Sequence, residues 1–489
     1  MTVAFSFLRR GGRSEPNLLK QKHNATKEDP TCSDAAGGSK PQRFDVHKET
    51  SITSSRHRCT RVMWDFLGVE AAPETHILVL CQWVITLLDR ATPSDRRRSS
   101  SVVRRGTPWS YTRRTITTGS TPSSILSFSM PLFNVQWSPR KDLGLSIRLH
   151  PSISRTHIVT SGGDLELLCA VPARHDPSKP PLLFIHGGFG AATEYRFFLE
   201  YFSSRGYPSY ALSVRGHGNS YAVGFWKMLF TSQHQMALDV TAGIRHVIDK
   251  HRSEGRPEIV PIAHSAGGAL LQYMLSEGLH SPPDPKKTDS QAYVVGRIGL
   301  LGVIPCFGGI GVYWNWIKLD PFYPLRMYLF HFGHPRSPLS STRLVKQAFF
   351  CDECPDERVR EFETREMAPY ESVAWPVGTL AAFADPEKIA RAVGLTNSSG
   401  IDSAEDLRPR VLVVAGGKDV LMRPGVMARL VGVLRDAVRS AFGSGTDNGD
   451  VQEGIRNGIE FRVVQGSGHH LMGDIYWEEC AEKVLRFLE

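Results

Sequence analysis

The stretch from Glu258 to Leu275 constrains the fold more than any other part of the chain. It reads EIVPIAHSAGGALLQYML. An apolar run short enough for a buried strand ends at Ala263, and a helix-forming run without proline opens after Gly268. Between them lies Ser265, in the strand-turn-helix context in which a sharp turn exposes a serine hydroxyl above a sheet. The competing interpretation is a serine at an ordinary strand-helix turn, because short motifs produce false positives.

The other segments predict an α/β protein built on a mostly parallel sheet with helices on both faces. A hairpin is expected first, and apolar runs then alternate with helical stretches, a pattern typical of strands that are buried on both faces. The predicted hairpin strands are 156–159 and 165–171. The later strands are 182–185, 210–214, 259–263, 298–304, 411–414 and 461–464, and the helices are 195–204, 236–251 and 475–488.

The chain divides by composition into a basic leader and an electrically balanced body. Residues 1–130 hold 20 Lys and Arg against 11 Asp and Glu, whereas the remainder carries 38 of each kind. We therefore predict that residues 1–135 are low in complexity and disordered, and that the body has no nucleic-acid partner. The Arg-containing start weakly suggests mitochondrial targeting. Residues 77–88 are too short to span a bilayer, and Met130 is a candidate natural start.

We predict an α/β core in two parts, 140–304 and 410–489, with a helical cap at 305–409. The interval between the strands at 298–304 and 411–414 does not continue the alternation, and a structureless loop of that length is unusual. Its aromatic residues either line an acyl pocket, face a lipid surface, or form a small core of the cap, and the last interpretation is preferred for most of them. They are Phe307, Tyr313, Trp314, Trp316, Phe322, Tyr323, Tyr328, Phe330 and Phe332.

A base and a carboxylate follow later strands in the order that serine catalysis on such a sheet requires. Asp419 comes after the strand at 411–414, and His469 and His470 come after the strand at 461–464. A serine hydroxyl needs a histidine base, and the base needs an orienting carboxylate. The competing interpretations are a turn or helix-capping role for Asp419 and a surface position for His469. His470 is the rival base.

A third requirement is a pair of backbone N–H groups that stabilise a developing oxyanion. Ala266, directly after the serine, supplies one candidate. The glycine-rich loop His186–Gly190 follows the strand at 182–185, and Gly188 is the second candidate. His186 is interpreted as a structural hydrogen-bonding residue. The loop lacks the glycine patterns that bind phosphate groups.

These segments together resemble the α/β-hydrolase superfamily, specifically its lysophospholipase- and monoglyceride-lipase-like esterase branch. The resemblance extends from about Thr156 to the C-terminus and includes the loop Ser213–Ser220, which is similar to the R-G-x-G-x-S loop of the family. It implies that the base directly follows a glycine, which favours His469 over His470. Gly267 matches the second glycine of G-x-S-x-G, and Ala263 replaces the first.

The resulting hypothesis is a serine hydrolase of carboxylic esters, lipid-like esters among them, that acts through an acyl-enzyme intermediate. Ser265, Asp419 and His469 are the predicted catalytic residues, and Gly188 and Ala266 the oxyanion donors. The alternatives are an inactive relative that binds a ligand, or a cofactor-free peroxidase, lyase or carbon–carbon hydrolase with the same three residues.

No cofactor or metal is predicted, because Cys351-x-x-Cys354 has no second pair of cysteines to complete a zinc site. The dispersed cysteines favour an intracellular, cytoplasmic setting. A peripheral membrane contact is an open expectation, and the oligomeric state stays open.

Overall fold

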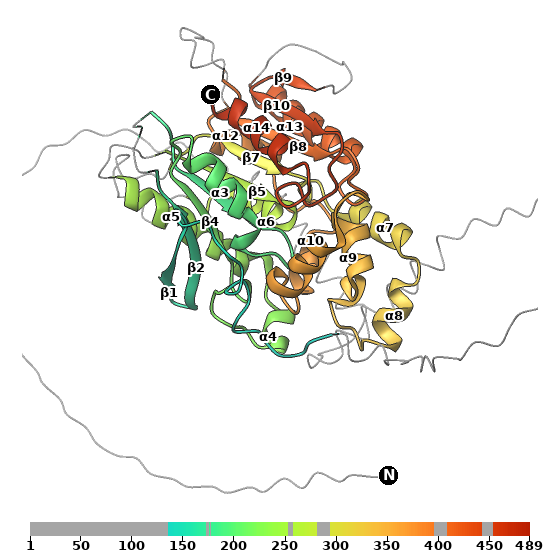
Figure 1. The fold of residues 1–489 in the computed structure, drawn as a ribbon. Helices are drawn as coiled ribbons and strands as arrows, with labels where there is room; N and C mark the ends of the chain where they lie inside the picture. The colour runs from blue at the N-terminus through green and yellow to red at the C-terminus, as the bar shows by residue number, and fades with distance from the viewer. Residues whose placement is uncertain are drawn as a thin grey trace, which may run out of the picture. The chain divides into compact units, whose positions relative to one another are not determined.

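A ten-stranded, mostly parallel sheet forms the centre of the computed structural model (Figure 1). The structure describes residues 135–172, 176, 178–252, 258–280, 294–395, 408–442 and 453–489. The predictions for the leader, for residues 77–88 and for Met130 fall outside these residues, apart from Val135 at the leader's end. The predicted α/β architecture, with a mostly parallel sheet between helices, is confirmed.

The sheet begins with an antiparallel hairpin and continues as parallel strands. The hairpin strand β2 pairs antiparallel with β4, the strands β4, β3, β5, β7, β8 and β10 run parallel to one another, and the edge strand β9 pairs antiparallel with β10. The order is β1-β2-β4-β3-β5-β7-β8-β10-β9, and β6 pairs with β5. The strands are β1 Ser154–Thr160, β2 Gly163–Ala170, β3 Leu182–Ile185, β4 Ser209–Leu212, β5 Glu258–His264, β6 Val294–Val295, β7 Ile298–Leu301, β8 Val411–Gly416, β9 Gly454–Arg456 and β10 Ile459–Val464.

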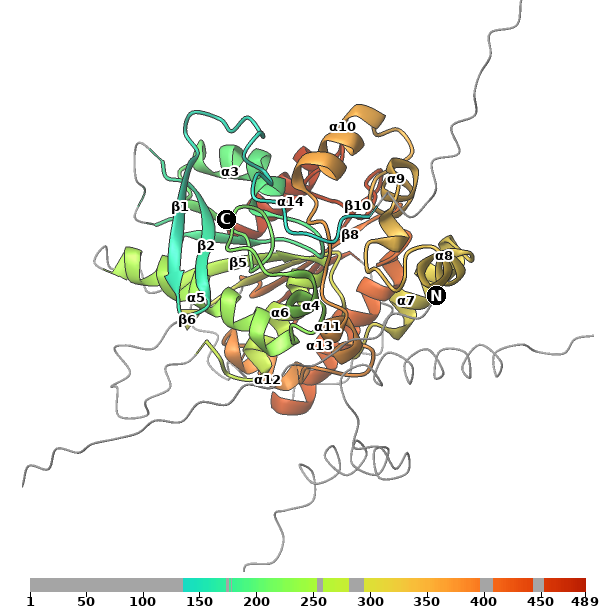
Figure 2. The same cartoon turned by 90° about the horizontal axis from the view of Figure 1, so that it is seen from below.

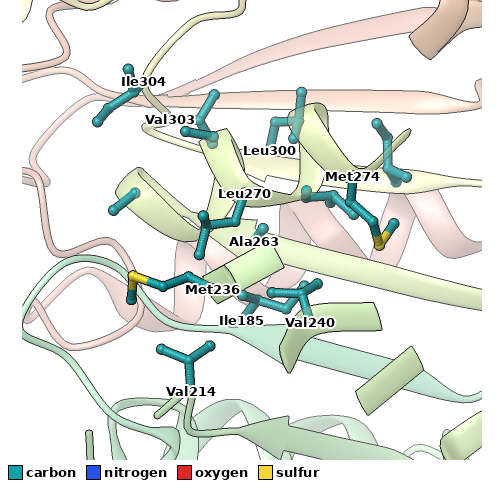
Figure 3. Close-up of a cluster of buried hydrophobic side chains, with 14 of the residues drawn as sticks. Ile185, Val214, Met236, Val240, Ala263, Leu270, Met274, Leu300, Val303 and Ile304 are labelled. Atoms are coloured by element: carbon teal, nitrogen blue, oxygen red, sulfur yellow. The ribbon is translucent and has the colours of Figure 1, made fainter. Parts of the chain in front are cut away.

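Helices cover both faces of the sheet, and each layer has its own buried cluster (Figure 2). One face packs against α3 (Arg196–Ser203) and α14 (Trp477–Leu488). The other packs against α5 (Gln233–Arg252), α6 (Ser265–Ser276) and α13 (Pro424–Phe442). Figure 3 shows how Met236 and Val240 of α5 and Leu270 and Met274 of α6 lie with strand residues such as Ile185, Ala263 and Leu300 in one apolar cluster.

The interval predicted as a cap contains helices joined by turns and irregular segments, with no strand among its described residues. It contains α7 (Ile310–Leu319), α8 (Tyr323–Leu329), a 3-10 turn (Ser337–Leu339), α9 (Thr342–Phe349), α10 (Asp356–Glu361), a π-helical turn (Phe362–Glu366), α11 (Ala374–Gly378) and α12 (Pro386–Ala392). The last of these, α12, packs against α6 and α13, so it joins a helical layer of the core. The domain limits at 305 and 409 stay predictions.

Several element boundaries and the exposure of several apolar side chains differ from the sequence predictions. The helix after the turn begins at Ser265 itself instead of after Gly268, and the strand from Ile298 ends at Leu301. On α5, the predicted helix at 236–251, most apolar side chains are buried but Leu238 is 43% exposed. The small-core interpretation of the cap aromatics is wrong for five of the nine, because Trp314, Phe322, Tyr328, Phe330 and Phe332 are exposed.

One short helix and one 3-10 turn complete the described elements. They are the 3-10 turn Ala192–Tyr195 and α4 (Phe225–Leu229). No helix among the described residues is both long enough and apolar enough to cross a bilayer.

Candidate active site

Ser265 stands at the junction of β5 and α6 with a backbone φ of +49°. A side chain in the left-handed region is uncommon, so the turn holds this serine under strain. The turn is possible because its neighbours are small. A Cβ at Gly267 would lie 2.3 Å from the carbonyl oxygen of His186, and a Cβ at Gly187 would lie 3.0 Å from Cβ of Ser265. The two loops therefore approach more closely than any side chain at these glycines would allow.

Replacing Gly267 by alanine is expected to destabilise the protein by about 3 kcal/mol or more, because the added methyl group collides with backbone and not with a flexible side chain. Urea unfolding of the two proteins would measure the difference. Gly425→Ala is the matched control, since a Cβ at this helical glycine meets nothing within 4 Å. Equal losses in the two variants would contradict the packing argument.

The structure brings Asp419 and His469 to Ser265, each from a loop beyond the carboxyl end of its strand. Nε2 of His469 lies 2.9 Å from Oγ of Ser265, and Nδ1 of His469 lies 2.7 Å from Oδ2 of Asp419. The other carboxylate oxygen of Asp419 accepts the backbone N–H groups of Leu421 and Met422, both at 2.8 Å. The three side chains form a hydrogen-bonded series in which Asp419 is immobilised by three donors.

Two further buried groups hold the loop that carries His469. Nε2 of His264 donates to the carbonyl oxygen of His469 at 2.9 Å. Burial is the main cause that lowers the pKa of His264 well below its ordinary value, so this imidazole is neutral. On the preceding residue, the N–H of Gly468 donates to Oδ2 of Asp474 at 3.0 Å, and the N–H of Cys351 donates to the same oxygen.

His470, the rival base, points elsewhere. Its ring nitrogens have no hydrogen-bond partner among the described residues, and its nearest carboxylate is that of Glu194, at 3.6 Å. Burial lowers the pKa of His470 to about 3 and raises that of Glu194 well above its ordinary value. Both groups are therefore neutral, and His470 packs against the rings of Phe350 and Phe362.

The loop after β3 lies against the start of α6, where an oxyanion would need its donors. A Cβ at Gly188 would lie 3.7 Å from Cβ of Ala266. The Gly188 N–H has no hydrogen-bond partner among the described residues, and Ala266 lies in the first helical turn, whose N–H groups have no partner within the helix. His186 uses both ring nitrogens structurally, because Nδ1 donates to the Gly187 carbonyl and Nε2 accepts from the Val214 N–H.

A buried ion pair beside this loop was not predicted from the sequence. Nε2 of His217 donates to Oε2 of Glu371 at 2.9 Å, and both side chains are almost fully buried. Burial alone would lower the pKa of His217 and raise that of Glu371, but the mutual attraction reverses both shifts. His217 belongs to the Ser213–Ser220 loop quoted above, so a sequence motif pointed to its importance. No motif pointed to Glu371, because it lies in the irregular segment between the π-helical turn and α11.

The ion pair makes the stability of the protein depend on pH in a defined direction. The raised pKa of His217 gives stabilisation that is complete below its ordinary value of 6.5 and is lost as the pH rises through the raised value. The lowered pKa of Glu371 gives stabilisation that is present above 4.5 and is lost as the pH falls through the lowered value. The pair therefore stabilises most between these two ordinary values.

His217→Gln is expected to cost about 3 kcal/mol at about pH 6 and clearly less at about pH 9, because alkali already removes the charge of the histidine in the unmodified protein. Chemical unfolding of both proteins at the two pH values would check this. A cost that does not change with pH would contradict the ion pair.

An open, mostly parallel sheet that presents a serine at a strained turn after its central strand defines the α/β-hydrolase fold. The chain matches the alpha/beta hydrolase family over residues 182–483, and it belongs to that family. A search of curated protein sequences finds no significant match.

Solved structures with a similar fold include several esterases. A carboxylesterase of the thaumarchaeon Nitrososphaera gargenis is 13% identical with a TM-score of 0.43, and the match covers 68% of this chain and 97% of that one. Carboxylesterase CesB of Bacillus subtilis is 13% identical with a TM-score of 0.41, covering 70% and 92%. An esterase of Pyrococcus furiosus is 15% identical with a TM-score of 0.40, covering 69% and 90%.

Proposed function

We propose that this hydrolase-family protein cleaves carboxylic esters with Ser265 as the nucleophile. The observation that supports the proposal best is the hydrogen-bonded series from Ser265 through His469 to Asp419, which starts at a residue of positive φ. Strain at the serine and a base within 3 Å are the conditions under which a hydroxyl becomes a nucleophile.

The reaction has two halves. In the first, Oγ of Ser265 bonds to the acyl carbon while His469 takes its proton, and the carbonyl oxygen becomes an oxyanion held by the N–H groups of Gly188 and Ala266. The ester C–O bond then breaks, and His469 returns the proton to the leaving alkoxide. In the second half, His469 deprotonates a water that attacks the acyl carbon, the bond from that carbon to Oγ of Ser265 breaks, and His469 returns the proton to Oγ as the acid leaves. Asp419 keeps the imidazole in the tautomer with a proton on Nδ1.

Within this reaction class we assign an apolar, lipid-like acyl group to the substrate. The ring of Phe349, from α9, lies 5.6 Å from the ring of His469, centroid to centroid. An apolar side chain at the base favours an acyl chain over a charged or strongly polar group. The five cysteines in the described part of the chain are unpaired and buried, which is compatible with the reducing interior of a cell.

Labelling of the full chain with a fluorophosphonate, followed by peptide mass spectrometry, tests the proposal. The adduct is expected on the peptide that carries Ser265. A panel of p-nitrophenyl esters of increasing acyl length would then show higher kcat/KM for medium and long chains than for acetate. A protein that binds apolar ligands but neither reacts with the probe nor cleaves any ester would instead be a ligand-binding relative.

A further inference from the structure

Helices α7 and α8 expose a stripe of large apolar side chains that nothing in the described part of the chain covers. Both figures of the fold place α8 at the outer edge of the described domain, away from the sheet (Figures 1 and 2). None of the side chains of α8 is buried. The exposed members, which we name the outer apolar face, are Ile310, Trp314, Phe322, Leu325, Leu329 and Phe332.

The spacing of these residues turns them to the same side of each helix. Ile310 and Trp314 are four positions apart on α7, and Phe322, Leu325 and Leu329 follow helical spacing along α8, so neighbouring members lie side by side. Phe322 is 72% and Phe332 70% exposed. Large apolar side chains exposed along two consecutive helices are typical of an interaction site.

Backbone strain at Phe332 adds a second, independent observation. This residue has a φ of +47°, which is rare for a bulky side chain and destabilising. Strain is ordinarily compensated by packing, but the ring of Phe332 is exposed and gains none from the described residues. An exposed, strained aromatic residue is therefore better explained by contact with something outside the described part of the chain.

The charges of this segment identify the chemistry of that contact. Residues 310–349 carry five basic residues and a single acidic one. Lys346 pairs with Asp356, and Arg336 donates to the Ala368 carbonyl. Lys318 and Arg343 are the exposed basic residues of this range. The acidic residue, Asp320, is buried and paired with Arg326. Lys318 is exposed, and its ammonium lies 5.9 Å from the ring of Trp314 at the edge of the outer apolar face. Trp, Phe and Leu next to positive charge are the composition of helices that lie in the interface of an anionic membrane.

We propose that the outer apolar face docks on the surface of a membrane that contains anionic lipids. The rings of Phe322 and Phe332 enter the boundary between headgroups and acyl chains, and Lys318 contacts lipid phosphate groups.

Vesicle sedimentation with the full chain tests this proposal. The protein is expected to bind phosphatidylcholine vesicles more tightly when they contain phosphatidylserine. The double variant Phe322→Ser/Phe332→Gly should weaken partitioning by tenfold or more, which corresponds to about 1.4 kcal/mol for each factor of ten. Glycine relieves the strain at position 332, so thermal stability should not fall. Val159→Ser, which alters an 84% exposed apolar residue on β1, is the matched control.

Three outcomes would overturn the assignment. One is an unmodified protein that binds neither kind of vesicle. Another is a double variant that binds as well as Val159→Ser. The third is a concentration-dependent dimer, seen by light scattering, that the double variant abolishes, because the face would then belong to a second copy of the chain.

A separate observation concerns the segment between β7 and β8, which we name the inserted segment. This segment holds the loop that is proposed to stabilise the oxyanion. Both backbone polar groups of Phe189 are bonded to the inserted segment. The N–H of Phe189 donates to Oε2 of Glu371 at 3.1 Å, and its carbonyl accepts from the N–H of Ala368 at 2.7 Å. Phe189 has a φ of +62°, so the loop adopts a conformation that external contacts must maintain.

Glu371 is itself fixed by contacts on both carboxylate oxygens. Oε2 also accepts from His217, and Oε1 accepts from the N–H of Ser372 at 2.8 Å and from Nε1 of Trp375 at 3.3 Å. A Cβ at Gly188 would lie 3.8 Å from Oε2. A carboxylate this near an oxyanion would oppose catalysis if it were unpaired, and the charge of His217 compensates for it.

The geometry points to Glu371 as a positioning residue that orients the N–H of Gly188. Because Glu371 belongs to the inserted segment, this orientation depends on the contact between that segment and the loop after β3. This inference rests on the proposed function. Glu371 does not touch the substrate, and its effect passes through the Phe189 peptide.

Glu371→Ala is expected to lower kcat by about 10²-fold with little change in KM, because a misplaced donor affects the transition state more than substrate binding. Glu371→Gln, whose amide oxygen can still accept from Phe189, should retain more activity. Affinity for an alkyl trifluoromethyl ketone, which forms an oxyanion adduct with the serine, should fall in parallel with kcat. The control is Glu366→Ala, which breaks another buried ion pair between the segment and the core, that of Arg196 and Glu366 at 2.7 Å.

Similar losses of stability in the Glu366 and Glu371 variants, with loss of kcat and ketone affinity only in the latter, would support the positioning role. Equal effects of the two variants on kcat would overturn it. Failure of the proposed function would be recognised separately, by an unmodified protein that lacks esterase activity and does not react with the fluorophosphonate.

Discussion

Ser265→Ala is expected to lower kcat/KM for p-nitrophenyl esters by about 10⁴- to 10⁶-fold and to remove labelling by a fluorophosphonate. The variant keeps the base, the carboxylate and the two backbone donors, but it has no atom that can form the acyl-enzyme. The residual rate would come from substrate binding and oxyanion stabilisation alone. Steady-state kinetics and gel fluorescence of the labelled protein would measure both effects. Full labelling of the variant would show that the nucleophile is another residue.

Ser265→Gly separates this chemical effect from damage to the fold. The serine has a φ of +49°, and glycine adopts that conformation without strain, which can stabilise the protein by about 1 kcal/mol. The glycine variant should therefore be as inactive as the alanine variant but at least as stable as the unmodified protein. A site kept at the expense of stability is typical of catalytic residues. Lower stability of the glycine variant would contradict the strain argument.

The strands were predictable because they are short apolar runs that this sheet buries on both faces. Val411–Gly416 and Leu182–Ile185 are buried at every position, so the sequence signal and the physical environment coincide. The order of the site residues was predictable for a related reason. Parallel strands end at the same edge of a sheet, so the residues that directly follow β5, β8 and β10 had to be near one another.

Contacts that depend on irregular segments could not be predicted in the same way. His217 and Glu371 are 154 positions apart, and Glu371 lies in no periodic element that would indicate which way its side chain points. The buried or exposed state of the aromatic residues between 307 and 332 was equally undetermined. An apolar residue on a short helix has the same sequence signal whether the helix covers a core or lies at the surface. Five of these aromatics proved to be exposed.

The choice between the two neighbouring histidines shows the same limit at a single residue. His469 and His470 are adjacent, and the resemblance to a family decided between them where the residues alone did not. In the structure the backbone turns so that only His469 faces Ser265, while His470 lies against Phe350 and Phe362. A turn of one residue decides which imidazole reaches the serine, and no local property of the two side chains encodes it.

Exchanging each histidine for glutamine is the sharpest test of that geometry. His469→Gln is expected to lower kcat by about 10⁴- to 10⁶-fold, because an amide cannot take the proton of Ser265 at neutral pH. His470→Gln should change kcat by less than about tenfold, since the imidazole of His470 is neutral and makes no hydrogen bond to another described residue. Kinetics with one ester at neutral pH would compare the two variants, and thermal unfolding would confirm that both are folded.

The opposite ranking of these variants would remove the basis of the proposed reaction. If His470→Gln were inactive and His469→Gln active, the hydrogen bond of 2.9 Å between His469 and Ser265 would have no catalytic role. If both variants were active, neither imidazole would be the base, and Ser265 would be a strained serine without a partner for proton transfer. Only a large loss confined to His469 agrees with a base that Asp419 orients on one side and the serine engages on the other.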